Sequence, residues 1–248
     1  AFFIDNARIV YVVNKQLLPT YDLFDERRYY EEGKGSSPVY YKGLRLGIHI
    51  CEDMWRNESQ YSQKLYDIDP VDSLGEQGVD LFINLSASPF ARAKDVKRQR
   101  IMSRYASKWK VPFLMVNTVG ANDSVVFDGR SKVFNSQGKL INEANAFEED
   151  TLIVDTNFLS QGTVLSSSDV ETVHDALVLG LKDYMKKNSM EKIIIGLSGG
   201  IDSAVCSVLS QEAVGADNVI CVTMPTRYSS EGSVKDSKKL CSNIGVRL

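Results

Sequence analysis

One short motif constrains the fold of this chain more than any other feature of the sequence. Residues 196–203 read Gly-Leu-Ser-Gly-Gly-Ile-Asp-Ser and lie between a run of isoleucines and a segment with helical periodicity. Glycines at such a junction let the backbone turn tightly and approach a ligand closely. The N–H groups of the turn, with a helix N-terminus behind them, can hold a pyrophosphate. The plainer alternative is a glycine turn in which Asp202 or Ser203 caps the helix.

Strand and helix patterns alternate around this motif. We expect strands at residues 192–197 and 218–223, and helices at 169–187, 202–214 and 230–243. This alternation predicts a parallel, doubly wound α/β sheet. Because two strands cannot complete such a sheet, we expect the second domain to be truncated in this chain.

The first part of the chain has a different pattern. A serine-rich stretch at residues 159–168 is interpreted as a linker between a first domain at 1–158 and a second domain at 169–248. A hairpin at 1–14 would put an edge strand at the very start, so we expect preceding sequence to be missing. The other elements predicted here are a loop at 15–33, strands at 44–51, 80–85, 112–119 and 151–155, helices at 70–78 and 94–110, and hairpins within 125–141 around Asp128-Gly129 and Gln137-Gly138.

Charge and cysteine usage exclude several functional classes. The chain has 29 basic and 32 acidic residues and a formal net charge of −3, which gives no electrostatic case for nucleic acid or an anionic membrane as a partner. Its apolar runs are far too short to cross a bilayer. Four cysteines without a CxxC pair, together with only two histidines, do not make the pattern of a zinc site. We therefore expect a reduced, cytoplasmic protein.

Cys51 lies at the end of a β-branched strand, in the segment 47–55 that reads Gly-Ile-His-Ile-Cys-Glu-Asp-Met-Trp. A strand end holds a nucleophile rigidly at the rim of a sheet, where functional sites usually lie. Glu52 and Asp53 would oppose formation of a thiolate, so a cation is required nearby. The alternative is that Cys51 packs in the core, as free cysteines often do.

The motif at 196–203 resembles the signature of the ATP pyrophosphatases, which adenylate a carboxylate or carbonyl and release pyrophosphate. It is not the phosphate loop GxxxxGK[ST], since no lysine follows the last glycine. The resemblance implies ATP as a substrate, hydroxyl donors on Ser198 and Ser203, and Asp202 as a ligand of Mg²⁺. The implied ATP-binding residues are Gly196, Leu197, Ser198, Gly199, Gly200, Ile201, Asp202 and Ser203.

A second segment narrows the choice of substrate. Residues 224–233 read MPTRYSSEGS and follow the second predicted strand, at the end where ligands bind in open α/β sheets. They resemble the MPSRYSS loop of NAD synthetases, with Thr226 in place of the usual serine, which implies deamido-NAD as the substrate. Alternatively, Ser229 or Ser230 simply caps the helix that follows.

The segment around Cys51 resembles the nucleophile segment of the nitrilase superfamily, as found in glutamine-dependent NAD synthetases. Such enzymes use a Glu-Lys-Cys triad, and their lysine lies in a K-x-x-L-P segment. Here Lys15-Gln-Leu-Leu-Pro19 precedes Cys51 and is followed by TYDLFDERR at residues 20–28. The resemblance implies that Lys15 and the backbone N–H of Glu52 stabilise an oxyanion. A solvated surface lysine is the alternative for Lys15.

The base glutamate of these enzymes lies well upstream of the lysine, and no segment before Lys15 can hold it in this chain. Glu26 is only a candidate for a supporting contact. An amidase made of these residues alone would be severely impaired, because general-base assistance is commonly worth about 10²–10⁴-fold.

The same resemblance implies three glutamine ligands. They are Tyr21, Ser88 in the segment 84–90 that reads NLSASPF, and Lys94 beyond it. Tyr21 could equally be a buried aromatic residue with a bonded hydroxyl, and Lys94 an exposed charge on a helix. Residues 119–129 resemble the VGGQDELVFDG loop of the family, but Ala121, Asn122 and Ser124 depart from it, so no contact is assigned there.

Together the resemblances imply a nitrilase-like α-β-β-α sandwich followed by a truncated doubly wound parallel-sheet domain of the adenine nucleotide alpha hydrolase type. The implied reaction is glutamine-dependent NAD synthesis. Glutamine is hydrolysed at Cys51, and its ammonia attacks ATP-adenylated deamido-NAD, giving NAD, AMP, pyrophosphate and glutamate. Such enzymes assemble as homo-oligomers. Two other hypotheses stay open, a stand-alone amidase acting on another small amide and a non-catalytic binding or regulatory subunit.

Overall fold

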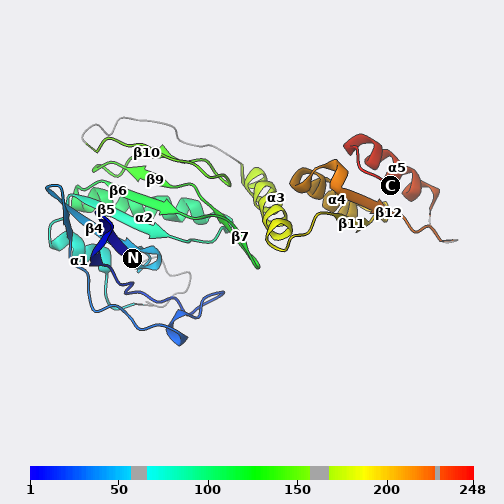
Figure 1. Ribbon diagram of the computed structural model, residues 1–248. Coiled ribbons are helices and arrows are strands. Elements are labelled where there is room, and N and C mark those ends of the chain that lie inside the picture. Colours follow the sequence, from blue (N-terminus) through cyan, green and yellow to red (C-terminus); the bar gives the residue numbers. More distant parts are fainter. Residues whose placement is uncertain (57–65, 157–167, 227–229) are drawn as a thin grey trace. The chain divides into compact units, whose positions relative to one another are not determined.

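The computed structural model describes residues 1–56, 66–156, 168–226 and 230–248 (Figure 1). The chain divides into two compact units. The first comprises Ala1–Val119 and Phe127–Ser166, and the second comprises Gly120–Val126 and Ser167–Leu248. The predicted linker at 159–168 lies outside the described residues apart from Ser168, so the predicted domain boundary stays a prediction.

A six-stranded mixed sheet forms the centre of the first unit. The strands lie in the order β10-β9-β6-β5-β4-β3, and β4, β5 and β6 run parallel. The paired residues Ile50↔Leu85 and Ser86↔Asn117 show that the carboxyl ends of these three strands meet at one edge. The bounds are Val39–Tyr41 for β3, Leu44–Ile50 for β4, Leu81–Ser86 for β5, Phe113–Asn117 for β6, Lys132–Phe134 for β9 and Leu140–Glu143 for β10.

Helices α1 (Pro70–Glu76) and α2 (Lys94–Trp109) cover one face of this sheet. Asp69 begins α1, because its side chain accepts a hydrogen bond from the backbone N–H of Asp72, and Pro70 follows with a fixed φ. The core under the two helices includes Phe82 and Phe113, both fully buried. Burying such a side chain stabilises the fold by about 1.5–3 kcal/mol.

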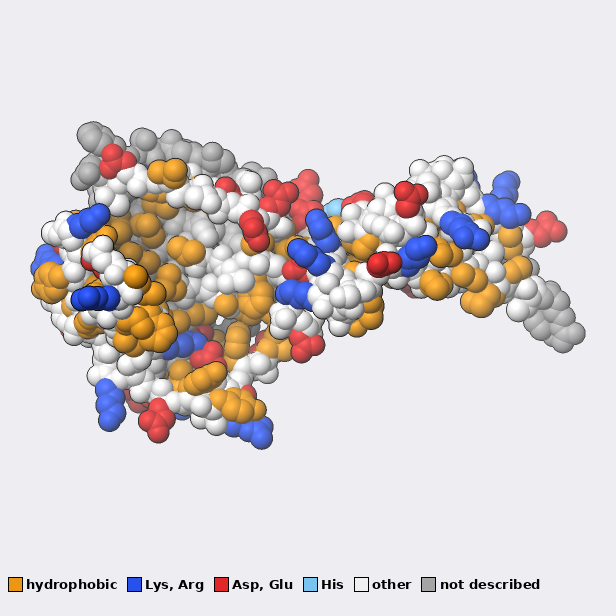
Figure 2. All heavy atoms as spheres, viewed as in Figure 1, with side chains coloured by type: hydrophobic (Ala, Val, Ile, Leu, Met, Phe, Trp, Pro, Cys, Tyr) orange, Lys and Arg blue, Asp and Glu red, His pale blue; other side chains and the backbone are white. Residues whose placement is uncertain are grey.

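The opposite face of the sheet is less covered. Its core consists of Val13, Val39, Leu46, Ile48 and Leu81. Further along the strands, Leu85 is 37% and Val116 is 54% exposed. Figure 2 shows hydrophobic side chains gathered on the face of the first unit that is turned to the viewer. The exposed end of this face is where the three parallel strands stop.

Two predicted elements of the first unit need correction. The residues Asp128-Gly129 do not form a hairpin, because they lead from β8 (Val125–Asp128), which pairs with β7 (Val119–Asn122), to β9 in the six-stranded sheet. The hairpin at Gln137-Gly138, between β9 and β10, is confirmed, as is the first hairpin, formed by β1 (Phe2–Asp5) and β2 (Arg8–Val12).

The predicted strand at residues 151–155 is also wrong. Its β-branched residues suggested a strand, yet Ile153 is 93% exposed and the segment pairs with no described strand. A single extended segment gains nothing from its composition unless a neighbouring strand takes up its backbone hydrogen bonds.

The second unit confirms the predicted alternation of helices and parallel strands. Strands β11 (Ile193–Gly196) and β12 (Val219–Val222) pair in parallel. The helices are α3 (Asp169–Lys187), α4 (Ile201–Val214) and α5 (Glu231–Ile244). Ser230 caps α5 by accepting a hydrogen bond from the N–H of Ser233, as one of the alternatives predicted, while Ser229 lies outside the described residues. Over the described parts of both units, none of the helices has the length and apolar character that a membrane span requires.

His49 on β4 is a buried polar residue in the core of the first unit. Its ring packs against Phe82 and Phe113, and its Nδ1 lies 3.1 Å from the carbonyl oxygen of Gly47. Its Nε2 has no hydrogen-bond partner among the described residues. Burial lowers the pKa of His49 to about 4. The folded chain therefore keeps this imidazole neutral at pH values where an exposed histidine is protonated.

We expect acid to destabilise the first unit through His49. The unfolded chain binds a proton here near pH 6.5, whereas the pKa in the folded state is about 4. The stabilisation is therefore complete above pH 6.5 and is lost as the pH falls to 4, by about 3 kcal/mol. Substituting His49→Leu should reduce the change in the free energy of unfolding between pH 7 and pH 4 by about that amount.

Urea unfolding followed by tryptophan fluorescence measures this effect in the first unit, because Trp55 and Trp109 are the two tryptophans of the chain. The half-exposed His174 belongs to the second unit, which contains no tryptophan, so His174→Gln is the control and should keep the wild-type pH dependence of the fluorescence transition. An unaltered pH dependence in His49→Leu would contradict the assignment.

Candidate active site

A cavity of about 490 Å³ opens at the edge where the parallel strands β4, β5 and β6 end. It brings together residues from four separate segments of the chain, including Lys15, Cys51 and the neighbouring Glu52. Its full lining is Lys15, Pro19, Phe24, Glu26, Ile50, Cys51, Glu52, Leu85, Ser86, Ala87, Val116, Asn117 and Thr118. A thiol, an ammonium group and two carboxylates therefore line one cavity, together with several apolar side chains.

Cys51 sits on a sharp turn. It is the first residue after β4 and begins a short 3₁₀ helix, Cys51–Met54, with φ at +44°. That conformation is uncommon for a residue with a side chain and is typical of functional turns. Burial raises the pKa of the Cys51 thiol, and the charge of Glu52 adds to this, whereas Lys15, Ser86 and Lys94 lower it. The cations that a thiolate needs are thus present.

Lys15 is held by Glu26. The Lys15 ammonium donates to both carboxylate oxygens of Glu26, at 2.7 and 2.5 Å. Both side chains are largely buried, with 16% and 26% of their surface exposed. Glu26 begins the 3₁₀ helix Glu26–Arg28. Sequence reasoning gave it only a supporting contact, and the acidic run after the K-x-x-L-P segment was the signal that pointed to it.

Glu52 accepts hydrogen bonds from two tyrosines. Its Oε1 receives the hydroxyl of Tyr21 at 2.7 Å and that of Tyr66 at 2.9 Å. Burial raises the pKa of Glu52, while the two hydroxyls and the charges of Lys15 and Lys94 lower it. Burial also raises the pKa of Tyr21, and Glu52 adds to that shift, so Tyr21 stays protonated. Sequence reasoning missed Tyr66, which lies in no motif.

Ser86 is a second residue that sequence reasoning missed. It ends β5, and its hydroxyl donates to Asn84 Oδ1. The hydroxyl also lies within hydrogen-bonding reach of Cys51, whose pKa it lowers. The predicted ligand Ser88 is buried two residues further on, where its backbone N–H donates to Asn117 Oδ1 at 2.9 Å. The parallel pairing of β4 with β5 is what brings Ser86 to Cys51.

Lys94 begins α2 close to the reactive cysteine. Its ammonium lies 5.6 Å from the centre of the Trp55 ring, a cation–π contact. Burial and Arg98 lower the pKa of Lys94, while Cys51 and Glu52 raise it, so its charge lies within electrostatic reach of both. The three predicted glutamine ligands, Tyr21, Ser88 and Lys94, are not among the residues that line the cavity.

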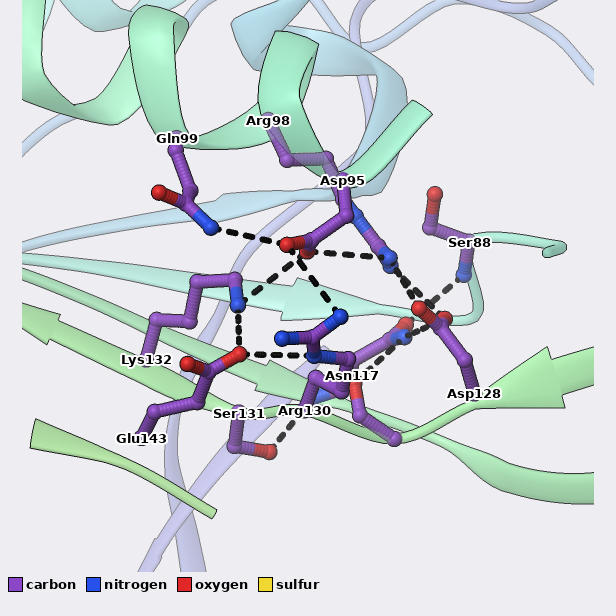
Figure 3. Close-up of polar contacts among 11 residues, drawn as sticks. Ser88, Asp95, Arg98, Gln99, Asn117, Asp128, Arg130, Ser131, Lys132 and Glu143 are labelled. Atoms are coloured by element: carbon purple, nitrogen blue, oxygen red, sulfur yellow. Dashed lines mark hydrogen bonds and ion pairs between the residues drawn. The ribbon is translucent and has the colours of Figure 1, made fainter. Parts of the chain in front are cut away.

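A buried network of charges anchors the first turn of α2 to the strands beside it (Figure 3). Arg98 donates to Asp128 from two nitrogens, one of them at 2.9 Å. Buried ions are costly unless they are paired, and here three cations meet three carboxylates. The network fixes the start of α2, where Lys94 lies. Its members are Asp95, Arg98, Asp128, Arg130, Lys132 and Glu143.

The predicted nucleotide loop forms a strand–turn–helix unit in the second unit. Gly199 has φ at +84°, and Gly200 is the N-cap of α4. Ser203 Oγ accepts the N–H of Ser198 at 3.2 Å and lies 3.1 Å from its hydroxyl. Gly200 brings no side chain to the cap, so the alternative in which Asp202 or Ser203 caps the helix is wrong.

Gly199 also touches helix α5. A Cβ atom at this position would lie 2.6 Å from both the Cα and the carbonyl oxygen of Ser233. Side chains essentially never approach a backbone so closely, so only glycine fits. The turn is therefore packed closely against the first turn of α5.

Comparison with known proteins matches both units. The carbon-nitrogen hydrolase family model matches residues 2–160, and the NAD synthase family model matches residues 173–248. The chain is 41% identical to a glutamine-dependent NAD(+) synthetase from Synechocystis sp. and 36% identical to one from Thermotoga maritima, over 99% of its own length in each case and 45% and 48% of theirs. It thus spans about half the length of the curated relatives it matches.

A solved structure is similar over the same extent. Glutamine-dependent NAD+ synthetase from Acinetobacter baumannii in complex with adenosine diphosphate superposes with a TM-score of 0.90 at 31% identity. The match covers 99% of this chain and 46% of the other.

Proposed function

This chain belongs to the carbon-nitrogen hydrolase family, and on that premise we propose that the protein is a glutamine-dependent NAD synthetase. The observation that carries the proposal is the cavity at the end of the parallel strands, which both Lys15 and Cys51 line and in which the charge of Lys15 lowers the pKa of the thiol. The second support is the glycine turn at 196–203, which begins a helix in a unit that matches the NAD synthase family.

In the first step, the Cys51 thiolate attacks the side-chain amide of glutamine. The carbonyl oxygen becomes an oxyanion, which the Lys15 ammonium and the backbone N–H of Glu52 stabilise. The proton that left the Cys51 thiol is passed to the amide nitrogen, so the C–N bond breaks and ammonia leaves as the thioester forms. Water then hydrolyses the thioester, which releases glutamate and restores the thiol. Glu26 keeps the Lys15 ammonium in place through its two hydrogen bonds.

Glutamine itself carries an α-carboxylate, which requires a cation at the site, and an α-ammonium group, which requires an anion. Lys94, which is half-buried, supplies the cation for the carboxylate, and Ser88 is assigned to the same end of the substrate. Tyr21 acts together with Tyr66 in holding the Glu52 carboxylate, since both hydroxyls donate to it. Charge-assisted hydrogen bonds of this kind are about twice as strong as neutral ones.

In the second step, ATP binds along residues 196–203 and adenylates the nicotinate carboxylate of deamido-NAD. Ammonia displaces AMP and leaves the amide of NAD. The similar solved synthetase is in complex with adenosine diphosphate, which supports binding of an adenine nucleotide. The backbone N–H groups of the turn and the hydroxyls of Ser198 and Ser203 hold the phosphates.

Mg²⁺ would be held by Asp202 together with the phosphates of ATP. The donor set fits, because Mg²⁺ commonly takes only one or two carboxylates beside substrate phosphates. Asp202 is exposed in the first turn of α4, next to the glycines. Because Asp202 supplies a single carboxylate, most of the coordination would come from the phosphates and water, and the ion would enter with the nucleotide. It would neutralise charge on the phosphates as pyrophosphate leaves.

We further propose a cytoplasmic homo-oligomer without nucleic-acid or membrane partners. The four cysteines are free thiols, which suits a reducing compartment. Coupling the two reactions in one protein has a physical reason, since free ammonia is lost to protonation and diffusion.

The direct test is an assay of the full-length protein with glutamine, ATP and deamido-NAD. The proposal requires that NAD, AMP, pyrophosphate and glutamate form together. Glutamate without AMP would favour a stand-alone amidase, and binding without any turnover would favour a regulatory subunit.

Replacing Lys94 with glutamine should raise the KM for glutamine by about 10–100-fold, because a charge-assisted hydrogen bond to the α-carboxylate is worth about 1.5–3 kcal/mol. NAD synthesis from ammonium chloride should not change. Steady-state kinetics with each nitrogen source measure this. Lys108→Gln, an exposed position near the other end of α2, is the control. A KM within threefold of the wild-type value would remove Lys94 from the glutamine site.

A further inference from the structure

Asp53 is a fully buried carboxylate that the reaction described above does not use. It is 0% exposed and accepts hydrogen bonds from three backbone N–H groups. Its Oδ1 receives those of Gln16 at 2.9 Å and Leu17 at 2.8 Å. Its Oδ2 receives that of Ile50 at 2.9 Å. One side chain therefore joins two segments that lie more than thirty residues apart in the sequence.

These three donors are the chain neighbours of the two reactive residues. Gln16 and Leu17 directly follow Lys15, and Ile50 directly precedes Cys51. Residues 13–20 form neither helix nor strand, so no ladder of backbone hydrogen bonds fixes their path. Buried amides require a partner, and the Asp53 carboxylate provides one for two of them.

On the other side, Asp53 closes the turn that carries Cys51. The Oδ2 bond to Ile50 spans the start of the short 3₁₀ helix Cys51–Met54. Cys51 itself has φ at +44°, a conformation that costs a residue with a side chain about 1–2 kcal/mol. A bond across the turn holds the backbone in that conformation, and the thiol thereby points into the cavity beside Lys15.

We propose that Asp53 is a positioning residue for amide hydrolysis, which sets the separation between the Lys15 ammonium and the Cys51 thiol by bonding the backbone on both sides. The proposal rests on the function proposed above, in which these two groups act together. An ionised carboxylate suits the role because it is an acceptor only and has two oxygens. An asparagine would present an N–H₂ group to one of the donors.

The rival explanation is that Asp53 merely stabilises the fold. The two explanations differ in their effect on Cys51. The charged groups facing this thiol are Lys15, Lys94 and Glu52, and Lys15 is the largest influence that lowers its pKa. Loss of the bridge should separate the thiol from Lys15 and so raise the pKa. A general loss of stability would leave the titration of Cys51 in the folded protein unchanged.

The test is the pH dependence of Cys51 alkylation by iodoacetamide in the full-length protein, read by mass spectrometry of the Cys51 peptide. In Asp53→Asn we expect the apparent pKa of alkylation to rise by at least one pH unit, and the rate at pH 7.5 to fall about tenfold or more. The exposed Cys206 serves as the reference within each sample and should keep its profile. A Cys51 profile that matches the wild type would overturn the proposal.

Asp69→Asn is the matched control, because Asp69 is another buried aspartate that accepts a backbone N–H, at the start of α1. It should leave the Cys51 profile within about 0.3 pH unit of the wild type. Asp53→Glu, which restores a carboxylate, should recover part of the loss. If Asp53→Asn does not fold, hydrogen exchange of the wild-type protein tests the proposal instead. The amides of Gln16 and Leu17 should exchange slowly, and rapid exchange would exclude the bridge.

This experiment separates the two proposals. Alkylation needs neither glutamine nor deamido-NAD, so the role of Asp53 can fail while NAD synthesis is found. Conversely, a wild-type protein that hydrolyses no glutamine would contradict the proposed function, even if Asp53 sets the pKa of the Cys51 thiol. With both intact, Asp53→Asn should lower kcat for glutamine hydrolysis about 10–100-fold and change the KM by less than threefold.

Discussion

Replacing Cys51 with alanine is expected to abolish glutamine-dependent NAD formation while leaving ammonia-dependent NAD formation intact. Removing the nucleophile of a covalent mechanism commonly costs 10⁴-fold or more in kcat, about the largest effect a single substitution has. The second unit holds its own loop and core, which do not include Cys51. Ammonium chloride should therefore still supply nitrogen to it.

The measurement is NAD formation by the full-length protein with glutamine and, separately, with ammonium chloride. Cys206→Ala is the control, since this exposed cysteine on α4 lies outside the cavity and should have the wild-type rate with both sources. Residual glutamine-dependent activity above about one percent of the wild-type rate in Cys51→Ala would contradict the assignment of the nucleophile.

Gly199→Ala should reduce NAD formation from both nitrogen sources by about 100-fold. The new methyl group would lie 2.6 Å from backbone atoms of Ser233, which cannot rotate away as a side chain would. Either the turn or α5 must shift, and the N–H groups of the turn no longer meet the phosphates. Each such charge-assisted hydrogen bond is worth about 1.5–3 kcal/mol, so losing one or two accounts for the expected decrease.

The effect is measured as kcat and as the KM for ATP with ammonium chloride as the nitrogen source. Gly245→Ala is the matched control. Gly245 has a similar positive φ of +71° at the end of α5, but a Cβ there would find its nearest neighbour at an ordinary 3.8 Å. Equal losses in the two variants would mean that backbone strain alone, and not the crowded turn, is responsible.

The local parts of both sites could be predicted from the sequence. Lys15, Cys51 and the turn at 196–203 are each defined by a few consecutive residues, and a strand that ends at a cysteine or at a glycine turn places that residue at the edge of a sheet. The helices and parallel strands of the second unit have periodic patterns that follow from the same short-range rules.

The residues that surround Cys51 could not be predicted in this way. Ser86 reaches the thiol through the register between β4 and β5, which a single sequence does not specify. Tyr66 meets Glu52 only once the chain has folded. From the sequence, Asp53 was interpreted as a negative charge that opposes formation of the Cys51 thiolate. In the structure its carboxylate accepts hydrogen bonds from backbone N–H groups.

The burial of a charged residue on α2 also could not be predicted from the sequence. Arg98 belongs to a helix with a heavily charged face, yet it is fully buried, because Asp128 comes from a distant strand to pair with it. The wrong strand at residues 151–155 has the opposite cause, since a favourable composition found no partner strand. In both cases tertiary contacts decided the outcome, and local pattern did not.

The central claim is that nitrogen released at Cys51 becomes the amide of NAD. It is tested most directly by giving the full-length protein glutamine labelled with ¹⁵N in its side-chain amide, together with unlabelled ammonium chloride, ATP and deamido-NAD. The account predicts that mass spectrometry finds ¹⁵N in the carboxamide of the NAD formed, and that Cys51→Ala forms only unlabelled NAD. Wild-type protein that forms only unlabelled NAD, or Cys51→Ala that forms ¹⁵N-labelled NAD, would contradict it.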